Sequence, residues 1–391
     1  MKIAIMSDFH LGFGEDALEQ ARFAIRKAIA AADFVILAGD LFDARVPKQE
    51  TVNEALKLFY ESKPDKSMLK MKIASEDGEK DVSAARFVAI YGTHERRTKG
   101  LVNAVQLLDS AGLVINVHAR KLIVEKEGEK VAVQGMGGVP EEVAERTLKL
   151  MNPLPVERAF NIFIFHQNLR ELIPVAEESL SAEDLPRGFD IYIDGHIHWA
   201  QEIRAGEKRI IIPGSTVVTQ MKKNETAAKG FFLFDTKKWE SEFVSIPSRP
   251  FFYSEIEFKE ATPEEVEKDV RVKLEELLSS AKGKAALVKL KLKGTLAKGI
   301  TSSNIDLKTV ERDYAETMKL TMDKDFFSEE LKEKIDFIKR MREEKKSVKE
   351  TGLEILKRKL AEKSYSLGKE EELFELLSQG ETEAALREIG A

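Results

Sequence analysis

Residues 2–12, KIAIMSDFHLG, decide the fold class, because an apolar run ends there in Asp8 and His10. Four further stretches share this design: residues 34–43 (FVILAGDLFD), 87–97 (FVAIYGTHERR), 161–167 (NIFIFHQ) and 191–200 (IYIDGHIHWA). Short runs rich in Ile, Val and Phe that are bounded by turn residues are typical of buried parallel strands. In open α/β sheets, ligands bind beyond the carboxyl ends of such strands. Five of the six histidines lie at these ends, so the pattern predicts a metal site.

The composition is typical of a soluble globular protein of two or three domains, with 391 residues and 33% charged residues. The chain has no cysteine, which excludes disulfides, thiolate metal sites and a cysteine nucleophile and suits a reducing compartment. No apolar run approaches the ~18 residues of a membrane span, and the chain begins with a strand signal rather than a signal peptide. We therefore expect a cytoplasmic protein without a membrane partner. The net charge of −6 argues against wholesale coating of nucleic acid but allows a local basic patch.

Residues 1–246 alternate strand and helix signals, which predicts a layered α/β domain. Helices are expected over about 16–32, 50–60 and 102–112, a hairpin around Glu127-Gly128-Glu129, and antiparallel strands over 210–213, 230–234 and 242–246. The polar stretch 61–86 reads as an inserted loop.

Pro247 and Pro250 mark a boundary, after which residues 247–322 predict a small α+β domain. From about Asp323 the charged chain, residues 323–391, predicts a linker and helices, with two short amphipathic stretches joined at Gly368. These stretches either pack on their own domain or dock on another protein.

The spacing of the polar residues at the strand ends favours metal binding. In an extended segment, Asp8 and His10 point to the same side, as do His196 and His198. A carboxylate at Asp40 could bridge two ions. Imidazole and carboxylate ligands without thiolates suit Mn, Fe, Zn or Ni. Two such ions about 3.5–4 Å apart form a clamp for phosphate-ester hydrolysis. His118 lacks an acidic companion and a strand-end position, so we interpret it as structural.

The motif series resembles the calcineurin-like metallophosphoesterase superfamily. The series is Asp8-x-His10, Gly39-Asp40, Gly92-Thr93-His94-Glu95, His166 and Gly195-His196-x-His198. The forms DFHLG and GDLFD, the Arg249-Pro250-Phe251 boundary and the PGST at 213–216 resemble more narrowly the nuclease of DNA double-strand-break repair. This is the meiotic-recombination-eleven (SbcD-like) family in its archaeal form. The resemblance covers about the first 250 residues, and the remainder matches only in layout.

The resemblance implies a sandwich of two sheets flanked by helices, a DNA-capping α+β domain and C-terminal helices, about 347–389, that bind a coiled-coil ABC-type ATPase. It implies two Mn²⁺ per subunit, with Mg²⁺ or another divalent ion as an alternative. One ion is expected on Asp8, His10, Asp40 and His198, and the other on Asp40, His166 and His196. Thr93 stands where the family has an asparagine ligand. Either Thr93 ligates directly or through water, which we favour, or Asn168 substitutes, or the second ion binds weakly.

The resemblance also implies a role for His94 outside the ligand set, in stabilising the phosphorane charge or protonating the leaving oxygen after water attacks phosphorus in line. Glu95 either orients His94 or acts as a structural cap, and Asp43 replaces a histidine that some members have near the substrate. Candidate DNA contacts are Arg45, Lys48, Arg96, Arg97, Lys99 and Ser215.

We thus expect a nucleoid-associated, Mn-dependent nuclease with 3′→5′ exonuclease action on duplex DNA ends and endonuclease action on single strands. It would work with the ATPase and as a homodimer through helices near 50–60 and 100–112. Two alternatives stay open. One is a phosphoesterase acting on small nucleotides or phosphomonoesters, and the other is a weakly catalytic scaffold that binds DNA ends.

Overall fold

The computed structural model describes residues 1–63, 69–75, 78–82, 86–98, 100–173, 179–281, 285–327, 348–362, 368–378 and 380–388. The chain forms two compact units. The first comprises Met1–Ser254, Leu274–Leu290 and Glu311–Thr321, and the second comprises Glu255–Lys273, Lys291–Val310 and Met322–Ala391. The three domain ranges predicted from the sequence stay a prediction. No helix in the described ranges is long and apolar enough to cross a membrane.

The first unit contains a mixed sheet with the predicted parallel strands at its centre. Within the described residues its order is β14-β13-β1-β2-β5-β6, and β1, β2, β5 and β6 run parallel. The strands are β1 (Lys2–Met6), β2 (Phe34–Ala38), β5 (Phe87–Ile90), β6 (Ile115–Asn116), β13 (Gly230–Asp235) and β14 (Glu240–Ser245). Helices α1 (Glu15–Ala31), α2 (Gln49–Glu61) and α3 (Ala104–Ser110) follow β1, β2 and β5, close to the ranges expected from the sequence.

A second sheet carries the histidine motifs of the later half. In the described part of the chain its order is β11-β12-β10-β9-β8-β7-β3-β4. Its strands are β3 (Lys70–Ser75), β4 (Gly78–Asp81), β7 (Lys121–Lys126), β8 (Glu129–Met136), β9 (Phe160–Phe165), β10 (Ile191–Asp194), β11 (Gln201–Ala205) and β12 (Lys208–Ile212). The predicted hairpin is confirmed by the antiparallel pair β7–β8. Sequence analysis missed α4 (Glu141–Met151).

The prediction of a loop over 61–86 was wrong in part. Strands β3 and β4 form an antiparallel hairpin that extends the second sheet through β7. Met71 and Ile73 are buried on one face while Lys70 and Lys72 are exposed on the other. This period of two is the pattern of a strand with one buried and one solvated face, and the surrounding charges hid it. Residues 64–68, 76–77 and 83–85 of the predicted loop lie outside the described residues.

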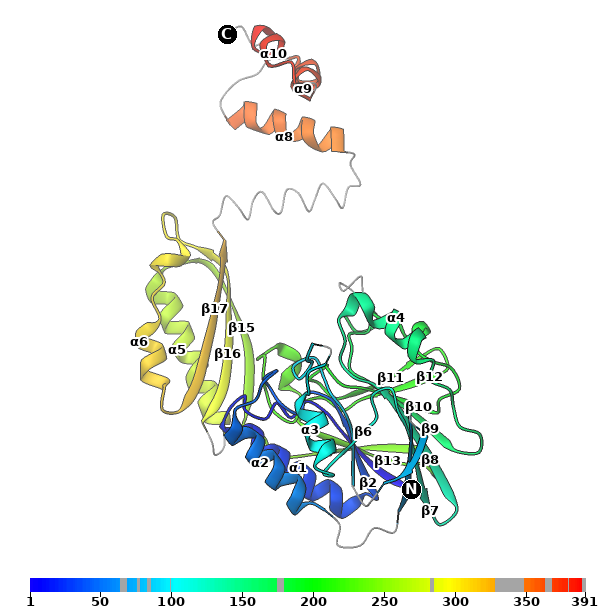
Figure 1. Cartoon of the computed structure of the whole chain (residues 1–391). Coiled ribbons are helices and arrows are strands. Elements are labelled where there is room, and N and C mark those ends of the chain that lie inside the picture. Colours follow the sequence, from blue (N-terminus) through cyan, green and yellow to red (C-terminus); the bar gives the residue numbers. More distant parts are fainter. Residues whose placement is uncertain are drawn as a thin grey trace. The chain divides into compact units, whose positions relative to one another are not determined.

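The two sheets face each other across a shared apolar core, which confirms the predicted layered sandwich (Figure 1). Alternate residues of each strand face opposite sides, so Ile3 and Ile5 of β1 enter the core between the sheets. Ala4 and Met6 enter a second core beneath α1, α2 and α3. The outer face of the second sheet packs against α4 in a third core. Because both faces of the central strands are covered, their carboxyl ends are the accessible edge.

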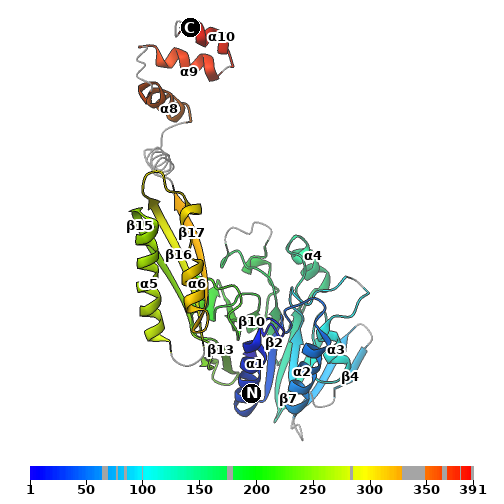
Figure 2. The same ribbon diagram turned by 90° about the vertical axis from the view of Figure 1, so that its left-hand side faces the viewer.

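A small three-stranded sheet follows, in the order β15-β16-β17 (Figure 2). Its elements are β15 (Phe251–Ala261), β16 (Ala286–Leu296), β17 (Met318–Phe327), α5 (Pro263–Ser280) and α6 (Lys308–Tyr314). Thr262 and Glu265 cap α5 reciprocally. The helical prediction beginning at Asp323 was wrong for 323–327, because β17 continues to Phe327. The remainder of that predicted start, residues 328–347, lies outside the described residues.

The C-terminal stretch forms three helices among its described residues rather than two: α8 (Val348–Glu362), α9 (Glu370–Ser378) and α10 (Thr382–Glu388). They contact one another, α8 with α9 and α9 with α10. Leu373 and Ala385 are buried among them, and Lys349 of α8 pairs with Glu375 of α9 at 2.7 Å. Some apolar side chains of these three helices are therefore buried against one another, while Ile355, Leu377 and Leu386 stay exposed.

Candidate metal centre

The loops that follow β1, β2, β5, β9 and β10 carry all the predicted ligands and meet at one edge of the sandwich. A parallel bridge between Ser7 and Ser215 joins the end of β1 to the chain beyond β12, and so links the two sheets at this edge. The N–H groups of Asp8 and His10 donate to the carbonyls of Gly39 and Asp40, each at 3.0 Å. These bonds hold the first two motif loops side by side.

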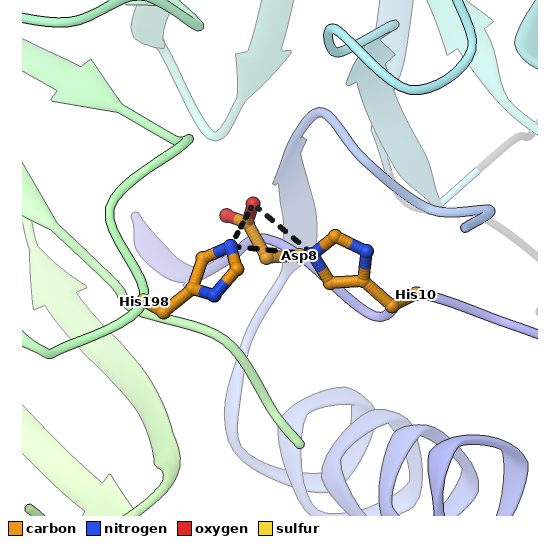
Figure 3. A group of neighbouring side chains, drawn as sticks. All are labelled: Asp8, His10 and His198. Atoms are coloured by element: carbon orange, nitrogen blue, oxygen red, sulfur yellow. Dashed lines mark hydrogen bonds and ion pairs between the residues drawn. The ribbon is translucent and has the colours of Figure 1, made fainter. Parts of the chain in front are cut away.

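Asp8, His10 and His198 form the first group of donors (Figure 3). The Nε2 atoms of His10 and His198 lie 3.7 and 3.6 Å from Asp8 Oδ1, and 3.3 Å from each other. Asp8 is fully buried, and neither of its carboxylate oxygens has a hydrogen-bond partner in the described structure. A buried carboxylate without partners is costly unless a cation compensates it. The donor set therefore fits a divalent ion.

Asp40, His166 and His196 form the second group, and their ligand atoms lie within 4.8 Å of one another. His166 Nδ1 lies 2.7 Å from the carbonyl of Ala38 and donates to it, which leaves Nε2 as the ligating atom, 3.1 Å from Asp40 Oδ2. The rings of His166 and His196 are 5.2 Å apart at their centroids.

Thr93 reaches this second group, with its hydroxyl 3.3 Å from Asp40 Oδ2. The amide nitrogen of Asn168 donates to Glu141, and its buried amide oxygen has no hydrogen-bond partner among the described residues. The contact of Thr93 with Asp40 supports Thr93 as an oxygen donor to the second ion. Its ligation stays a prediction.

The carboxylates around the two groups favour a positive charge on His10 and His166, whereas burial keeps His196 neutral. Burial alone would lower the pKa of His10, but the hydrogen bond to Asp43 and the nearby negative charge of Asp8 raise it to about 9. Burial opposes the protonation of His166 too, yet the charge of Asp40 raises the pKa of His166 to about 10. Burial would raise the pKa of Asp40, and the charge of His166 outweighs it and holds that pKa well below its usual range. Burial lowers the pKa of His196 to about 4.

Four of the predicted ligands have left-handed backbone conformations: Asp8 (φ 53°), His10 (φ 47°), Asp40 (φ 48°) and His196 (φ 69°). Such values are uncommon for residues with a side chain and cost about 1–3 kcal/mol each. They bend the chain sharply just after each strand, so that side chains from different strands turn toward a common point. Strain of this kind typically clusters at functional sites.

Two motif glycines permit the close approach of the ligands. A Cβ on Gly92 would lie 2.1 Å from Asp40 Oδ1, and one on Gly195 would lie 2.1 Å from the Ala38 carbonyl and 2.4 Å from His166 Nδ1. No side chain fits at either position without moving Asp40 or His166.

Replacing Gly195 by alanine is expected to displace His166 and to cost about 1–3 kcal/mol of stability through overpacking. Metal binding by the second group should weaken strongly, which Mn²⁺ titration calorimetry would measure. Gly14→Ala is the matched control, since a Cβ there meets nothing within 4 Å. Wild-type Mn²⁺ binding by Gly195→Ala would refute this packing argument.

His94 lies beside both groups but outside them. Its side chain is 43% exposed, its backbone N–H donates to Asp40 Oδ1 at 2.8 Å, and its Nδ1 lies 2.6 Å from the carbonyl of Asp43. The bond to a carbonyl requires a proton on Nδ1, so Nε2 is the free atom on the exposed ring.

The contacts of Glu95 support a structural role rather than a role in orienting His94. Its buried carboxyl accepts from the N–H groups of Phe42 and Gly92, each at 2.9 Å, and no described contact joins it to His94. Burial and the charge of Asp40 raise the pKa of Glu95 to about 8. Glu95 therefore holds the second and third motif loops together. His118 is also structural: its Nδ1 accepts from the N–H of Gly137 at 3.0 Å, and burial lowers its pKa to about 4.

A buried polar network behind His198 escaped sequence analysis. His198 Nδ1 lies 2.7 Å from Thr219 Oγ1 and 3.5 Å from Glu225 Oε1. Lys229 donates to the carbonyl of His198 at 2.9 Å and to Ser215 Oγ at 2.8 Å. These residues fall in an irregular segment with no strand-end pattern, so no local signal marked them. Asp43, whose side chain contacts His10, was noted only as a departure from the family pattern.

The candidate DNA contacts differ in their exposure. Arg45 and Lys48 are exposed after the second motif, and Arg96 and Arg97 are half-buried after His94. Lys99 lies outside the described residues. Ser215 is 1% exposed, and its hydroxyl donates to the carbonyl of Val217 at 2.6 Å, so its side chain does not reach the surface and serves the fold.

Comparison with known families agrees with this geometry. The model of the calcineurin-like phosphoesterase family matches residues 1–200, which contain the motif loops from Asp8 to His198. The chain belongs to this family.

The curated relatives that the chain matches are double-strand break repair proteins. The chain is 25% identical over 298 residues to the DNA double-strand break repair protein Mre11 of Archaeoglobus fulgidus, covering 66% of this chain and 62% of that protein. It is 28% identical over 276 residues to the Mre11 of Methanopyrus kandleri, covering 63% and 57%. The match to MRE11 of Coprinopsis cinerea, at 24% identity, covers 68% of this chain and 44% of the fungal protein. The matches thus span about half of the relatives' length.

Proposed function

We propose that this protein is a divalent-metal-dependent nuclease that processes DNA double-strand-break ends. The observation that carries the proposal is the buried, unpartnered carboxylate of Asp8 among imidazoles gathered from several strand ends, with the exposed His94 beside it. The relatives are DNA double-strand break repair proteins, and this similarity supports the substrate class.

One ion would be held by Asp8, His10 and His198 and shared through Asp40, and a second by Asp40, His166 and His196 with Thr93 nearby. Two Mn²⁺ ions are the proposed occupants, with Mg²⁺ or another divalent ion as an alternative. When bound, such ions polarise a phosphoryl oxygen and lower the pKa of a water to near neutrality.

His94 is the proposed catalytic residue. The Asp43 carbonyl holds its Nδ1 proton, so Nε2 is the atom that would face the scissile phosphate. From there a protonated imidazole would stabilise charge on phosphorus or hand a proton to the leaving sugar oxygen. Arg45, Lys48, Arg96 and Arg97 are the proposed contacts to the phosphate backbone, while Lys99 stays a candidate outside the described residues.

The proposal extends to the kind of cleavage and to the location of the protein. We propose 3′→5′ exonuclease action on duplex ends and endonuclease action on single strands. The proposed location is cytoplasmic and nucleoid-associated. A homodimer through α2 and the α3 region is supported by exposed apolar side chains: Tyr60 (70% exposed), Val102 (63%) and Leu107 (44%). A coiled-coil ABC-type ATPase is the proposed partner of α8–α10, whose exposed Ile355, Leu377 and Leu386 would lie in that contact.

Digestion of an end-labelled linear duplex with Mn²⁺, with and without an ATPase subunit, tests the proposal. We expect Mn²⁺-dependent shortening from the 3′ ends. Hydrolysis of a small phosphate ester with intact DNA would instead indicate a small-molecule phosphoesterase. DNA-end binding without any cleavage would indicate a scaffold. Either outcome would contradict the proposal.

Metal binding is expected to release about two protons per chain at pH 7.5, because His10 and His166 have pKa values of about 9 and 10 and must lose their protons to ligate. In the metal-free protein, these raised pKa values stabilise the fold fully below about pH 6.5 and cease to do so as the pH rises through 9–10. Calorimetric Mn²⁺ titrations in two buffers of different ionisation enthalpy count the released protons. A count near zero would contradict the assignment.

A further inference from the structure

Asp43 stands between the metal centre and the exposed imidazole of His94. It follows β2 by five residues and is 30% exposed. Its carboxylate Oδ1 lies 3.2 Å from His10 Nδ1 and 3.6 Å from His94 Nδ1, and its backbone carbonyl lies 2.6 Å from that same His94 atom. The rings of His10 and His94 stand edge to face beside it, with centroids 4.9 Å apart.

The two contacts of Asp43 have different chemical consequences. The Nε2 atom of His10 faces Asp8 and His198, so only Nδ1 of this ring is turned to Asp43. A carboxylate only accepts hydrogen bonds, and it therefore holds the proton on Nδ1 and leaves the Nε2 lone pair for an ion. The backbone carbonyl does the same for His94 and leaves its Nε2 for the substrate.

We infer that Asp43 is a positioning residue that fixes the tautomers of His10 and His94 together, its side chain serving the first ion and its backbone serving the catalytic imidazole. The inference rests on the proposed function for the role of His94, but the part concerning His10 needs only metal binding. Because side chain and backbone serve different rings, a side-chain substitution separates the two effects.

His198, the other histidine of the first group, also has a partner that holds its Nδ1 atom. His198 has its Nδ1 held by Thr219 and, further away, by Glu225. Among the described residues, Asp43 is the carboxylate that plays this part for His10. Outer partners of ligating histidines typically contribute 10–100-fold to metal affinity. Loss of the Asp43 carboxylate is expected to have an effect of this size on one ion.

The test is Mn²⁺ titration calorimetry on the full chain with Asp43→Ala and Asp43→Asn. We expect Asp43→Ala to weaken one of two Mn²⁺ sites by 10–100-fold and to leave the other unchanged. Asp43→Asn, whose amide oxygen still accepts, should lose less. Near-saturating Mn²⁺ should restore the cleavage rate of both variants, since the carbonyl that holds His94 remains. A purely structural role would not give recovery with added metal.

Asp33→Ala is the matched control. Asp33 precedes the same strand and is 21% exposed, but it pairs with Lys126 at 2.7 Å. It should bind Mn²⁺ like wild type. Equal affinities in wild type and both Asp43 variants, or equal weakening of both sites, would overturn the inference. If Asp43→Ala does not fold, Asp43→Asn decides it. If no form of the protein cleaves DNA, the proposed function fails while the Mn²⁺ isotherms still test Asp43.

Discussion

Replacing His94 by glutamine is expected to lower the rate of the proposed DNA cleavage by about 10²–10⁴-fold, the usual contribution of a general acid or base. Binding of DNA and of Mn²⁺ at the two proposed sites should be unchanged, because His94 lies in neither the Asp8 group nor the Asp40 group, although it lies with His10 and Asp43 in a third group of donors. The geometry gives the reason: the ring is exposed, its Nδ1 is held by the Asp43 carbonyl, and its Nε2 is free. Single-turnover cleavage at saturating Mn²⁺ isolates this step from binding.

His118→Gln is the comparison for this variant, since it makes the same chemical change at an imidazole that packs against Tyr91. It should lose some stability and keep most of the cleavage rate. Cleavage by His94→Gln at the wild-type rate would show that the role assigned to His94 is wrong. Lost Mn²⁺ binding in that variant would show that His94 is a ligand instead.

Replacing Asp8 by asparagine is expected to remove one ion and with it more than 10³-fold of the cleavage rate, because the site loses its buried anionic ligand. A ligand at 100 times its dissociation constant stabilises a protein by about 2.7 kcal/mol. The rise in melting temperature on adding Mn²⁺ should therefore shrink in the variant. Without metal, the variant should be less stable than wild type near neutral pH, since the folded protein holds the pKa of Asp8 below its usual value and the charge of Asp8 raises the pKa of His10.

Asp109→Asn controls for a carboxylate away from the site, where Asp109 pairs with Arg120 at 2.9 Å. It should keep the full Mn²⁺-induced rise in melting temperature. An undiminished rise in Asp8→Asn would contradict the ligand role of Asp8.

Short-range patterns predicted the layered α/β domain and the convergence of its strand ends, while the sandwich of two sheets came from the family resemblance. Apolar runs such as 34–38 specify buried strands, and a polar residue just beyond such a run must lie at the carboxyl edge. Sequence patterns did not reveal strands in which charged residues masked the alternation of apolar and polar side chains. Lys70 and Lys72 on the solvated face hid strand β3, and the charged stretch from Asp323 hid the end of β17.

Tertiary contacts within the site were beyond sequence reasoning for a different reason. The support of His198 by Thr219 and Glu225 joins residues 21 and 27 positions apart through an irregular segment. The left-handed backbone at Asp8 and His196 arises from the surrounding packing, since neither residue type requires it. Ser215 lies in a motif expected near DNA, yet its hydroxyl donates to the carbonyl of Val217 and accepts from Lys229 inside the fold. Proximity in a motif does not determine exposure.

If the strand ends hold a pair of cations, anomalous scattering from crystals soaked in Mn²⁺ should show two peaks about 3.5–4 Å apart. One should lie against Asp8, His10 and His198, and the other against Asp40, His166 and His196. Peaks elsewhere on the chain, or no peak at these residues at millimolar Mn²⁺, would contradict it.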